Sequence, residues 1–360
     1  MTLIYDKLTR TFGREKARLY WEANKAALEQ YRALCRGIDC GFQERDAFVY
    51  SLNRRDRLEQ EVRSLERLGV PAELVDKPSL PFATAGAVRF PGQAQFHPLR
   101  FLASIAKGLR IHERTKVLEL KPGGAKTHQG TVRADKIIIA THFPVLNKHG
   151  AYALKLYQSR SYVLALEGAP GLDGLYVDEA EGGLSFRDAD GLLLVGGGGH
   201  RTGKRGGGWD ELSGFAKGAW PQAREVCRWA AQDCMSLDGV PYIGQYSKGT
   251  PGLFVATGFN KWGMTSAMAA AMVLTDLVQG KDNPYAALFS PSRTMLRPQL
   301  ALNAVEAAAS LLTPTAPRCP HMGCALKYNP QEHSWDCPCH GSRFGRDGRL
   351  IDNPATDDMK

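Results

Sequence analysis

The sequence of 360 residues contains no run of eighteen apolar residues, so it predicts no membrane-spanning helix. Its first residues include no apolar signal segment, and we therefore expect a cytoplasmic protein. The net charge of +9 comes from scattered basic residues rather than from a basic stripe interleaved with aromatics, so nucleic acid is not an expected partner. The length and the apolar content are those of an ordinary globular protein with room for two domains.

Cysteine is scarce until the C-terminal end of the chain. Cys35, Cys40, Cys227 and Cys234 are dispersed, and we expect them to be reduced, with Cys35 and Cys40 as packing residues. The other four cysteines lie in two short boxes, Cys319-Pro-His321-Met-Gly-Cys324 and Cys337-Pro-Cys339-His340-Gly-Ser342. Half of the cysteines are thus concentrated where histidines stand beside them, which indicates a metal centre.

The ligand types in these two boxes are interleaved. Cys319 and His321 form a Cys-x-His box, and Cys337 and His340 form a Cys-x-x-His box. A zinc finger usually takes both cysteines from one loop and both histidines from the next. Interleaving suits a centre in which one iron takes both cysteines and the other takes both histidines, which is the Rieske [2Fe–2S] arrangement. A structural zinc site in the tail is the alternative. Ser342 adds a hydroxyl that can tune the potential of a cluster.

This stretch resembles the Rieske motif of cytochrome bc-type complexes, both boxes included. The resemblance implies a disulfide between Cys324 and Cys339 that ties the two loops together. The family usually has Tyr where Phe344 stands. Because Phe cannot donate a hydrogen bond, we expect a lower reduction potential here.

The rest of the chain predicts alternating helices and strands. We expect helices over residues 8–34 and 53–68, another helix that starts near His97, and a strand over 136–141 that is buried on both faces of a parallel sheet. Residues 161–187 predict a largely antiparallel block, and Leu192 begins a strand that runs into the glycines 196–199. The fold class expected is α/β (α+β) with two interwoven domains.

A second informative region lies between residues 237 and 279. It contains Asp238-Gly-Val-Pro-Tyr-Ile-Gly244, then a predicted strand over 253–257, a loop over 258–263, and an alanine-rich helix from Met264 to Gln279. The first N–H groups of a helix have no partner within the helix and lie at the positive end of its dipole. This strand, loop and helix therefore form a suitable site for an electron-rich ligand, although many α/β proteins have such a turn without one.

These segments resemble the flavin-contacting part of the D-amino-acid oxidase/glycine oxidase superfamily, and more narrowly the bacterial branch with a C-terminal Rieske domain. The resemblance covers nearly the whole chain and implies bound FAD and a [2Fe–2S] cluster. It also implies that the strand over 115–120 passes the adenine side of the cofactor. The implied FAD contacts are Val117, Gly258, Asn260, Lys261, Trp262, Gly263, Met264 and Thr265.

The chain departs from this family in two ways. The family begins with a Gly-x-Gly-x-x-Gly turn that holds the FAD pyrophosphate, and this sequence has no such motif, which puts FAD binding in doubt. The strands expected before the first ligand box also look shortened. We therefore expect an oxidoreductase region over 1–290 with an incomplete nucleotide-binding sheet and an antiparallel substrate-domain sheet, a helical linker over 291–316, and a small all-β Rieske domain over 317–360.

The expected function is that of an FAD-dependent oxidoreductase that passes electrons between a substrate-reduced flavin and the cluster. A separate nucleotide-binding piece can complete it. The alternatives are an iron–sulfur electron carrier without FAD, or a truncated inactive fragment or misassigned start. The expected partners are an unidentified small molecule, such as an amine or amino acid, and a redox protein. No catalytic residue is identified. The candidates are His142, His149, His200, Arg160 and Arg187, and for each of them a structural role is the simpler explanation.

Overall fold

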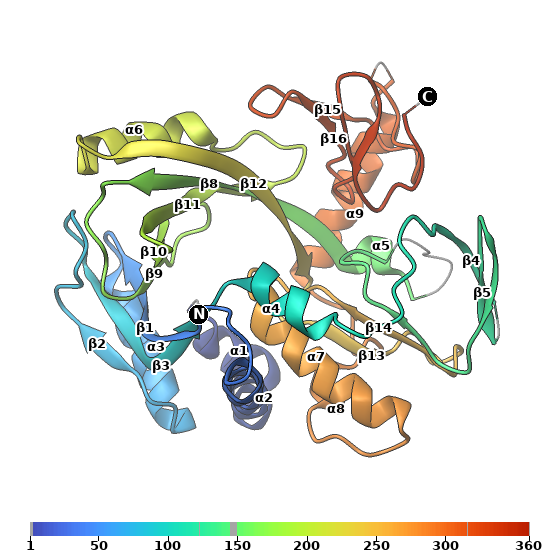
Figure 1. Ribbon diagram of the computed structural model, residues 1–360, viewed down its shortest axis with the longest axis horizontal. Coiled ribbons are helices and arrows are strands. Elements are labelled where there is room, and N and C mark those ends of the chain that lie inside the picture. The colour runs from blue at the N-terminus through green and yellow to red at the C-terminus, as the bar shows by residue number, and fades with distance from the viewer. Residues whose placement is uncertain (1–2, 122, 145–149, 315, 360) are drawn as a thin grey trace. The chain divides into compact units, whose positions relative to one another are not determined.

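The computed structural model describes residues 3–121, 123–144, 150–314 and 316–359. The chain forms two compact units, each assembled from separate segments (Figure 1). Unit 1 contains residues 1–28, 41–97 and 159–233, and unit 2 contains residues 29–40, 98–158 and 234–360. The expectation of two interwoven domains is confirmed, while the boundaries at 290 and 316 stay a prediction.

Unit 1 is built on an eight-stranded sheet with the strand order β12-β8-β11-β10-β9-β1-β3-β2. The strands are β1 (Gln43–Ser51), β2 (Glu73–Val75), β3 (Gly86–Gln95), β8 (Leu156–Glu167), β9 (Leu175–Asp178), β10 (Ser185–Ala189), β11 (Leu192–Arg201) and β12 (Arg224–Ser236). Only the β1–β9 pair among the described registers of this sheet is parallel, and the antiparallel block predicted over 161–187 is present.

One face of this sheet forms the apolar core of unit 1. Tyr162, Leu164, Phe186 and Val195 alternate onto that face, where α6 (Trp209–Ala219) packs against them. The other helices of unit 1 are α1 (Tyr5–Phe12) and α3 (Arg55–Leu68), and α2 (Arg14–Cys35) runs from unit 1 into unit 2. Because neighbouring side chains of a strand point to opposite faces, Arg187 lies on the face opposite the Phe186 core.

The single helix predicted over 8–34 is wrong, because the chain folds there as two helices. Gly13 separates α1 from α2 with a φ of 84°, a conformation that side-chain-bearing residues rarely adopt. The buried carboxylate of Glu61 also accepts hydrogen bonds from the backbone N–H groups of Tyr5 and Asp6 at 2.8 and 2.9 Å. The start of α1 is therefore fixed onto α3 by a contact that sequence periodicity does not reveal.

The glycines 196–199 belong to β11 and do not form a loop after it. A Cβ on Gly198 would lie 3.1 Å from the backbone of Gly207 and Gly208, and the φ of Gly198 is 63°. The pairing of β11 with β8 also shifts its register between Gly197 and His200. The glycines thus permit a bulge and a close approach of two backbone segments.

Three small sheets lie in the described part of unit 2. The first has the order β13-β14-β7, with β7 (Ile137–Ile139), β13 (Tyr242–Gln245) and β14 (Leu253–Thr257). The second is β4-β5-β6, with β4 (Val117–Lys121), β5 (Gly124–Thr127) and β6 (Gly130–Arg133). The third is β15-β16-β17-β18, with β15 (Lys327–Asn329), β16 (Ser334–Asp336), β17 (Arg343–Phe344) and β18 (Leu350–Asp352).

The described part of unit 2 also contains helices. They are α4 (Pro98–Ile105), α5 (Tyr152–Lys155), α7 (Gly263–Val278), α8 (Ala286–Phe289) and α9 (Pro298–Leu312). The core of the first sheet consists of aromatic and aliphatic side chains, which include Phe143, Tyr152, Tyr242 and Val255. Within the part of the chain that the structure describes, no helix combines the length and the apolar character needed to cross a bilayer.

The β-branched run at 136–141 forms a parallel strand as predicted, but it is not buried on both faces. β7 pairs in parallel with β14 and has no second neighbour among the described strands. Ile139 is 7% exposed within the core, whereas Ile138 is 47% exposed on the opposite face. The run therefore predicts the strand, but not that one of its faces stays half-exposed.

This difference between adjacent residues predicts different effects of one substitution. Ile139→Thr places a hydroxyl in the core, and we expect the free energy of unfolding to fall by about 1–3 kcal/mol. Ile138→Thr should change it by no more than about 0.5 kcal/mol, because that side chain is already half in solvent. Urea unfolding followed by circular dichroism measures both. Equal losses would show that the Ile138 face is covered in solution.

Candidate functional site

Two loops on the small C-terminal sheet bring the predicted metal ligands together. Cys319 and His321 belong to the first loop, and Cys337 and His340 belong to the loop between β16 and β17. Cys319, Cys337 and His340 are buried, and His321 is partly exposed. Phe344 is fully buried in the same cluster of side chains. The two boxes that the sequence singled out thus converge on one interior site.

The two imidazoles are held in the form that binds metal. Their ring centroids lie 5.0 Å apart at nearly a right angle, and the Nδ1 atom of each ring is buried. Nε2 of His340 lies 3.1 Å from the carbonyl oxygen of Ala153 and donates to it, which leaves Nδ1 with its lone pair. Burial, with the neighbouring His340 ring, lowers the pKa of His321 to about 4, so this ring is neutral at pH 7.

Phe143 connects these rings to the body of unit 2. Its side chain is fully buried, and its ring centroid lies 6.3 Å from that of His321 and 5.7 Å from that of His340. The carbonyl of Phe143 accepts a hydrogen bond from the hydroxyl of Thr141, just beyond β7. An apolar ring therefore covers the side of the imidazole pair that faces the first sheet.

The four thiols of the two loops crowd into the same cluster. The sulfur atoms of Cys324, Cys337 and Cys339 lie within 4.8 Å of one another. All four are thiols in the structure, and the Cys324–Cys339 disulfide stays a prediction. A hydrogen bond with Cys337 lowers the pKa of Cys319 to about 7, burial opposes this shift, and the Ser342 hydroxyl lowers the pKa further. Hydrogen bonds with Cys319 and the other thiols raise the pKa of Cys337.

The donor set fits an iron–sulfur cluster. Two buried thiols and two imidazoles with buried Nδ1 atoms converge, and thiolates buried this closely need positive ions to balance their charge. Cys319 and Cys337 would bind one iron and His321 and His340 the other. The three-thiol group of Cys324, Cys337 and Cys339 is the observation that a zinc site would use instead.

A buried polar network closes the second ligand loop. Asp336 precedes Cys337, and Arg343 follows Ser342. The guanidinium of Arg343 contacts Asp336 at 3.1 Å, Glu332 at 2.8 Å and the hydroxyl of Ser334 at 2.9 Å. The ion pair therefore joins the residues that flank the loop at its two ends.

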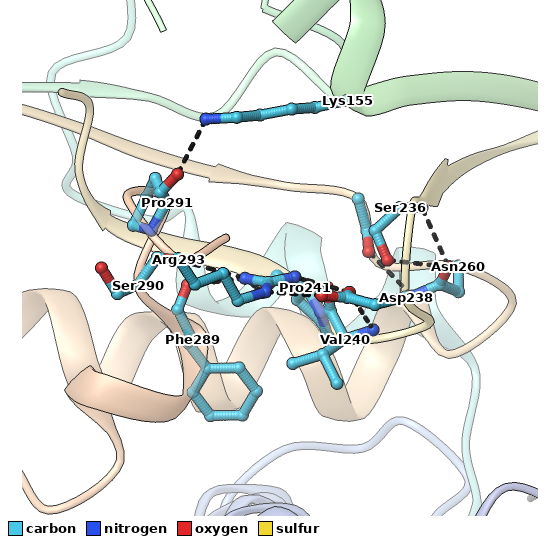
Figure 2. Close-up of polar contacts among 11 residues, drawn as sticks. Lys155, Ser236, Asp238, Val240, Pro241, Asn260, Phe289, Ser290, Pro291 and Arg293 are labelled. Carbon is cyan, nitrogen blue, oxygen red and sulfur yellow. Dashed lines mark hydrogen bonds and ion pairs between the residues drawn. The ribbon is translucent and has the colours of Figure 1, made fainter. Parts of the chain in front are cut away.

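The turn that was expected to contact flavin lies between β14 and α7. Asn260 has a φ of 53°, and its side chain accepts a hydrogen bond from the N–H of Ser236 at 3.1 Å and donates one to the carbonyl of Gly258 at 2.9 Å (Figure 2). Lys261, Gly263 and Met264 are exposed, and Trp262 and Thr265 are partly buried. Among the described residues no side chain caps α7, and its first turn carries no acidic residue. This open, positive helix start fits an electron-rich edge of a cofactor.

Val117 lies in a different sheet from this turn. It pairs with Thr127 in the register of β4 with β5, beside an open hollow lined by Arg114, Lys116 and His128. Its role on the adenine side therefore stays a prediction.

The structure explains some of the histidine and arginine candidates by local contacts and leaves others open to a ligand. Nδ1 of His200 lies 2.9 Å from the carbonyl of Gly198, and its ring stacks on Tyr162, which explains it structurally. His142 is exposed beyond β7 with a φ of 63°, and its Nε2 lies 3.1 Å from Gln158. His149 lies outside the described residues. Arg160 is buried and engaged with neighbours, whereas no described carboxylate pairs with Arg187, whose pKa burial lowers.

Two buried cations were missed by the sequence reasoning. Arg293 makes a two-pronged contact with Asp238, with both distances 2.8 Å, and its guanidinium lies 3.8 Å from the Tyr242 ring centroid. Lys155 donates to the carbonyl of Pro291 at 2.8 Å (Figure 2). Burial, with the nearby Arg293, lowers the pKa of Lys155 to about 8. A lone Lys in the apolar run Tyr-Ala-Leu-Lys-Leu-Tyr was the available signal.

Two family models match successive parts of the chain. The model of the FAD dependent oxidoreductase (DAO) family matches residues 4–277, and the model of the Rieske [2Fe-2S] domain matches residues 299–360. The Rieske 2Fe-2S iron–sulfur protein YhfW of Bacillus subtilis is 32% identical over 423 residues, which cover 99% of this chain and 83% of that protein. The matched span exceeds the 360 residues of this chain, so the relative contains internal segments that have no counterpart here.

Other similarities cover single parts of the chain. A D-amino acid dehydrogenase of Cereibacter sphaeroides is 28% identical over 288 residues, which cover 67% of this chain and 63% of that protein. Glycine oxidase from Geobacillus kaustophilus has a TM-score of 0.66 at 21% identity and covers 78% of this chain and 83% of its own. L-proline dehydrogenase from P. horikoshii has a TM-score of 0.61 at 16% identity, with 75% and 82% covered. These structural similarities show the fold.

The network around the second loop predicts that Arg343→Met removes both stability and metal. The substitution leaves Asp336 as a buried, uncompensated charge, which costs about 3–5 kcal/mol. We expect a lower melting temperature of the purified protein and a loss of bound iron, measured by calorimetry and metal analysis. Arg349→Met is the control, because that side chain is exposed and its ion pair with Asp347 lies at the surface. Full iron content in Arg343→Met would contradict the role of the network.

The hydroxyl of Ser342 predicts a shift in reduction potential. It lowers the pKa of the Cys319 thiol, and a hydroxyl that donates to a cluster sulfur stabilises the reduced, more negative state. Losing a bond worth about 1–1.5 kcal/mol should lower the potential in Ser342→Ala by about 40–60 mV for a one-electron couple. Spectroelectrochemical titration measures it, with Ser342→Thr as the variant that keeps the hydroxyl. An unchanged potential in Ser342→Ala would exclude this role.

Proposed function

This chain belongs to the family of FAD-dependent oxidoreductases and carries a Rieske domain, and from that premise we propose that it oxidises a small amine or amino acid and delivers the electrons singly to a redox protein. When bound, FAD accepts a pair of electrons from a substrate, and the [2Fe–2S] cluster accepts and releases one electron at a time. The observation that carries the proposal is that unit 2 holds both the flavin-type turn before α7 and the cluster ligands.

The residues of unit 2 have distinct parts in this proposal. Cys319, Cys337, His321 and His340 hold the cluster, and Phe143 excludes water from the imidazole side that faces the first sheet. The turn from Gly258 to Thr265, braced by Asn260, presents the open start of α7 to the flavin.

Arg187 supports a substrate that carries a carboxylate. It is the candidate guanidinium that no described acidic residue neutralises, and it lies on the face of its sheet opposite the Phe186 core. A guanidinium can bind a carboxylate through two parallel hydrogen bonds. The names of the relatives, a D-amino acid dehydrogenase and a glycine oxidase, indicate the same class of substrate.

A second candidate function is favoured by β7. Its outer face leaves Ile138 half-exposed. If the half-exposed face of β7 weakens the binding of FAD, the chain acts as an iron–sulfur electron carrier that receives its electrons from another flavoprotein.

The proposal predicts the spectrum of the protein purified without oxygen. We expect flavin bands together with the broad bands of a histidine-ligated cluster, and a panel of amino acids and amines should bleach both. In Arg187→Leu, bleaching by carboxylate substrates should slow about 10- to 150-fold, because a charged hydrogen bond contributes about 1.5–3 kcal/mol. Reduction of this variant by dithionite is the control and should stay normal. Cluster bands without flavin bands would contradict the oxidase function and support the electron carrier. A protein that contains zinc and no iron would contradict both functions.

A further inference from the structure

The single helical turn α5 is joined to four separate elements. The hydroxyl of Tyr152 donates to the carbonyl of Tyr246 at 2.9 Å, and the carbonyl of Ala153 accepts from His340 at 3.1 Å. The carbonyl of Leu154 accepts from the side-chain amide of Asn303 at 3.0 Å. Lys155 donates to the carbonyl of Pro291 at 2.8 Å. Every residue of α5 therefore has a long-range partner, which ordinary packing of one turn does not require.

The short length of α5 explains why two of its carbonyls are available. The last carbonyl groups of a helix have no acceptor role within the helix and need partners from outside. In α5 the carbonyl of Tyr152 accepts from the N–H of Leu156, whereas those of Ala153 and Leu154 accept from His340 and Asn303. A metal ligand and a linker-helix side chain thus complete the same helix end.

The anchors of α5 are buried and hold it firmly. Tyr152 is fully buried, Lys155 and Asn303 are buried, and Gln299 donates to the Asn303 side-chain oxygen at 3.1 Å, which orients the amide toward Leu154. An isolated turn of four residues is unstable in water, so these contacts help to fix where the Ala153 carbonyl points.

We propose that Asn303 and Lys155 are positioning residues for the cluster, which act by holding the Ala153 carbonyl against Nε2 of His340. The proposal rests on the assignment of His340 as a ligand within the proposed function. A carbonyl that accepts from a ligand imidazole increases the electron density on the ring and favours the oxidised cluster. The tether therefore lowers the reduction potential, which is opposite in sign to the effect of the Ser342 hydroxyl on the sulfur of Cys319.

The test is the reduction potential of the iron-loaded protein, titrated with dithionite and followed by electron paramagnetic resonance. In Asn303→Leu the amide that holds Leu154 is lost while the volume is kept. We expect the equilibrium constant for cluster reduction to rise about three- to tenfold, which is about 30–59 mV, and the nitrogen couplings of the ligand imidazole to change. Lys155→Met should change the potential and the couplings in the same direction. Asn303→Gln keeps a donor, so its potential should lie closer to the wild-type value than that of Asn303→Leu.

A matched variant separates positioning from general loss of stability. Val273→Ala opens a cavity in the buried face of α7, away from α5, and should lower the melting temperature without moving the potential or the couplings. If Asn303→Leu and Lys155→Met bind iron and behave like Val273→Ala, the proposal is wrong. If Asn303→Leu does not fold, Lys155→Met alone decides it by the same readout.

This experiment is independent of substrate and flavin. A cluster that titrates normally but is never reduced by substrate would contradict the proposed function and leave the role of α5 intact. A normal substrate reaction with unchanged potentials in both variants would support the proposed function and contradict the role of α5. A wild-type protein without iron would overturn both, because His340 would not be a ligand.

Discussion

The contact between Arg343 and Asp336 is the constraint on which the cluster site depends. The strands on either side of the second ligand loop have only three and two residues. Within the loop, the N–H of Cys337 donates to the carbonyl of Ser342 at 2.8 Å, and the N–H of Gly341 donates to the carbonyl of Cys337 at 2.9 Å. The buried ion pair joins the loop at its base, where Glu332 and Ser334 complete the network. Charges of this kind are stable only when every partner is present. The positions of His340 and Ser342 follow from this closure.

Two polar groups with opposite expected effects on the reduction potential lie beside the predicted ligands once the loop is closed. The Ser342 hydroxyl lowers the pKa of the Cys319 thiol, and the Ala153 carbonyl accepts from the imidazole of His340, so each acts on a predicted ligand. Each acts through a neighbour of the metal rather than through the metal itself. The potential of the centre is therefore expected to reflect a balance between the small domain and the body of unit 2.

The local parts of this arrangement could be predicted from the sequence, and the distant parts could not. The ligand boxes are contiguous, so their spacing alone identifies Cys319, His321, Cys337 and His340 as a set. The loop before α7 was also predictable, because strand, glycine and helix follow one another directly. By contrast, His340 and Ala153 are 187 positions apart, and α5 is too short to show a helical period. Asp238 belonged to a segment that the sequence singled out, but its partner Arg293 lies 55 positions away.

The boundaries of the elements show the same limit. The apolar spacing of residues 8–34 predicts one continuous helix, but Gly13 divides it into two. The first of these helices is held at its start by Glu61 of α3, a contact that the spacing does not reveal. The exposure of Ile138 depends on which elements pack on that face of β7, and a run of isoleucines carries no such information. Periodicity identifies the type of an element, and tertiary contacts decide where it ends and what covers it.

The interleaving of the two units has a consequence for how the protein is made. Unit 1 needs its first segment and residues 159–233 together, so it cannot close while only the early part of the chain has left the ribosome. Unit 2 gains Phe143 and α5 before the ligand boxes are synthesised. Contacts of such sequence separation slow folding. The surface that receives the imidazoles is therefore synthesised before them, and loading of iron and sulfide is expected to be a late step in biogenesis.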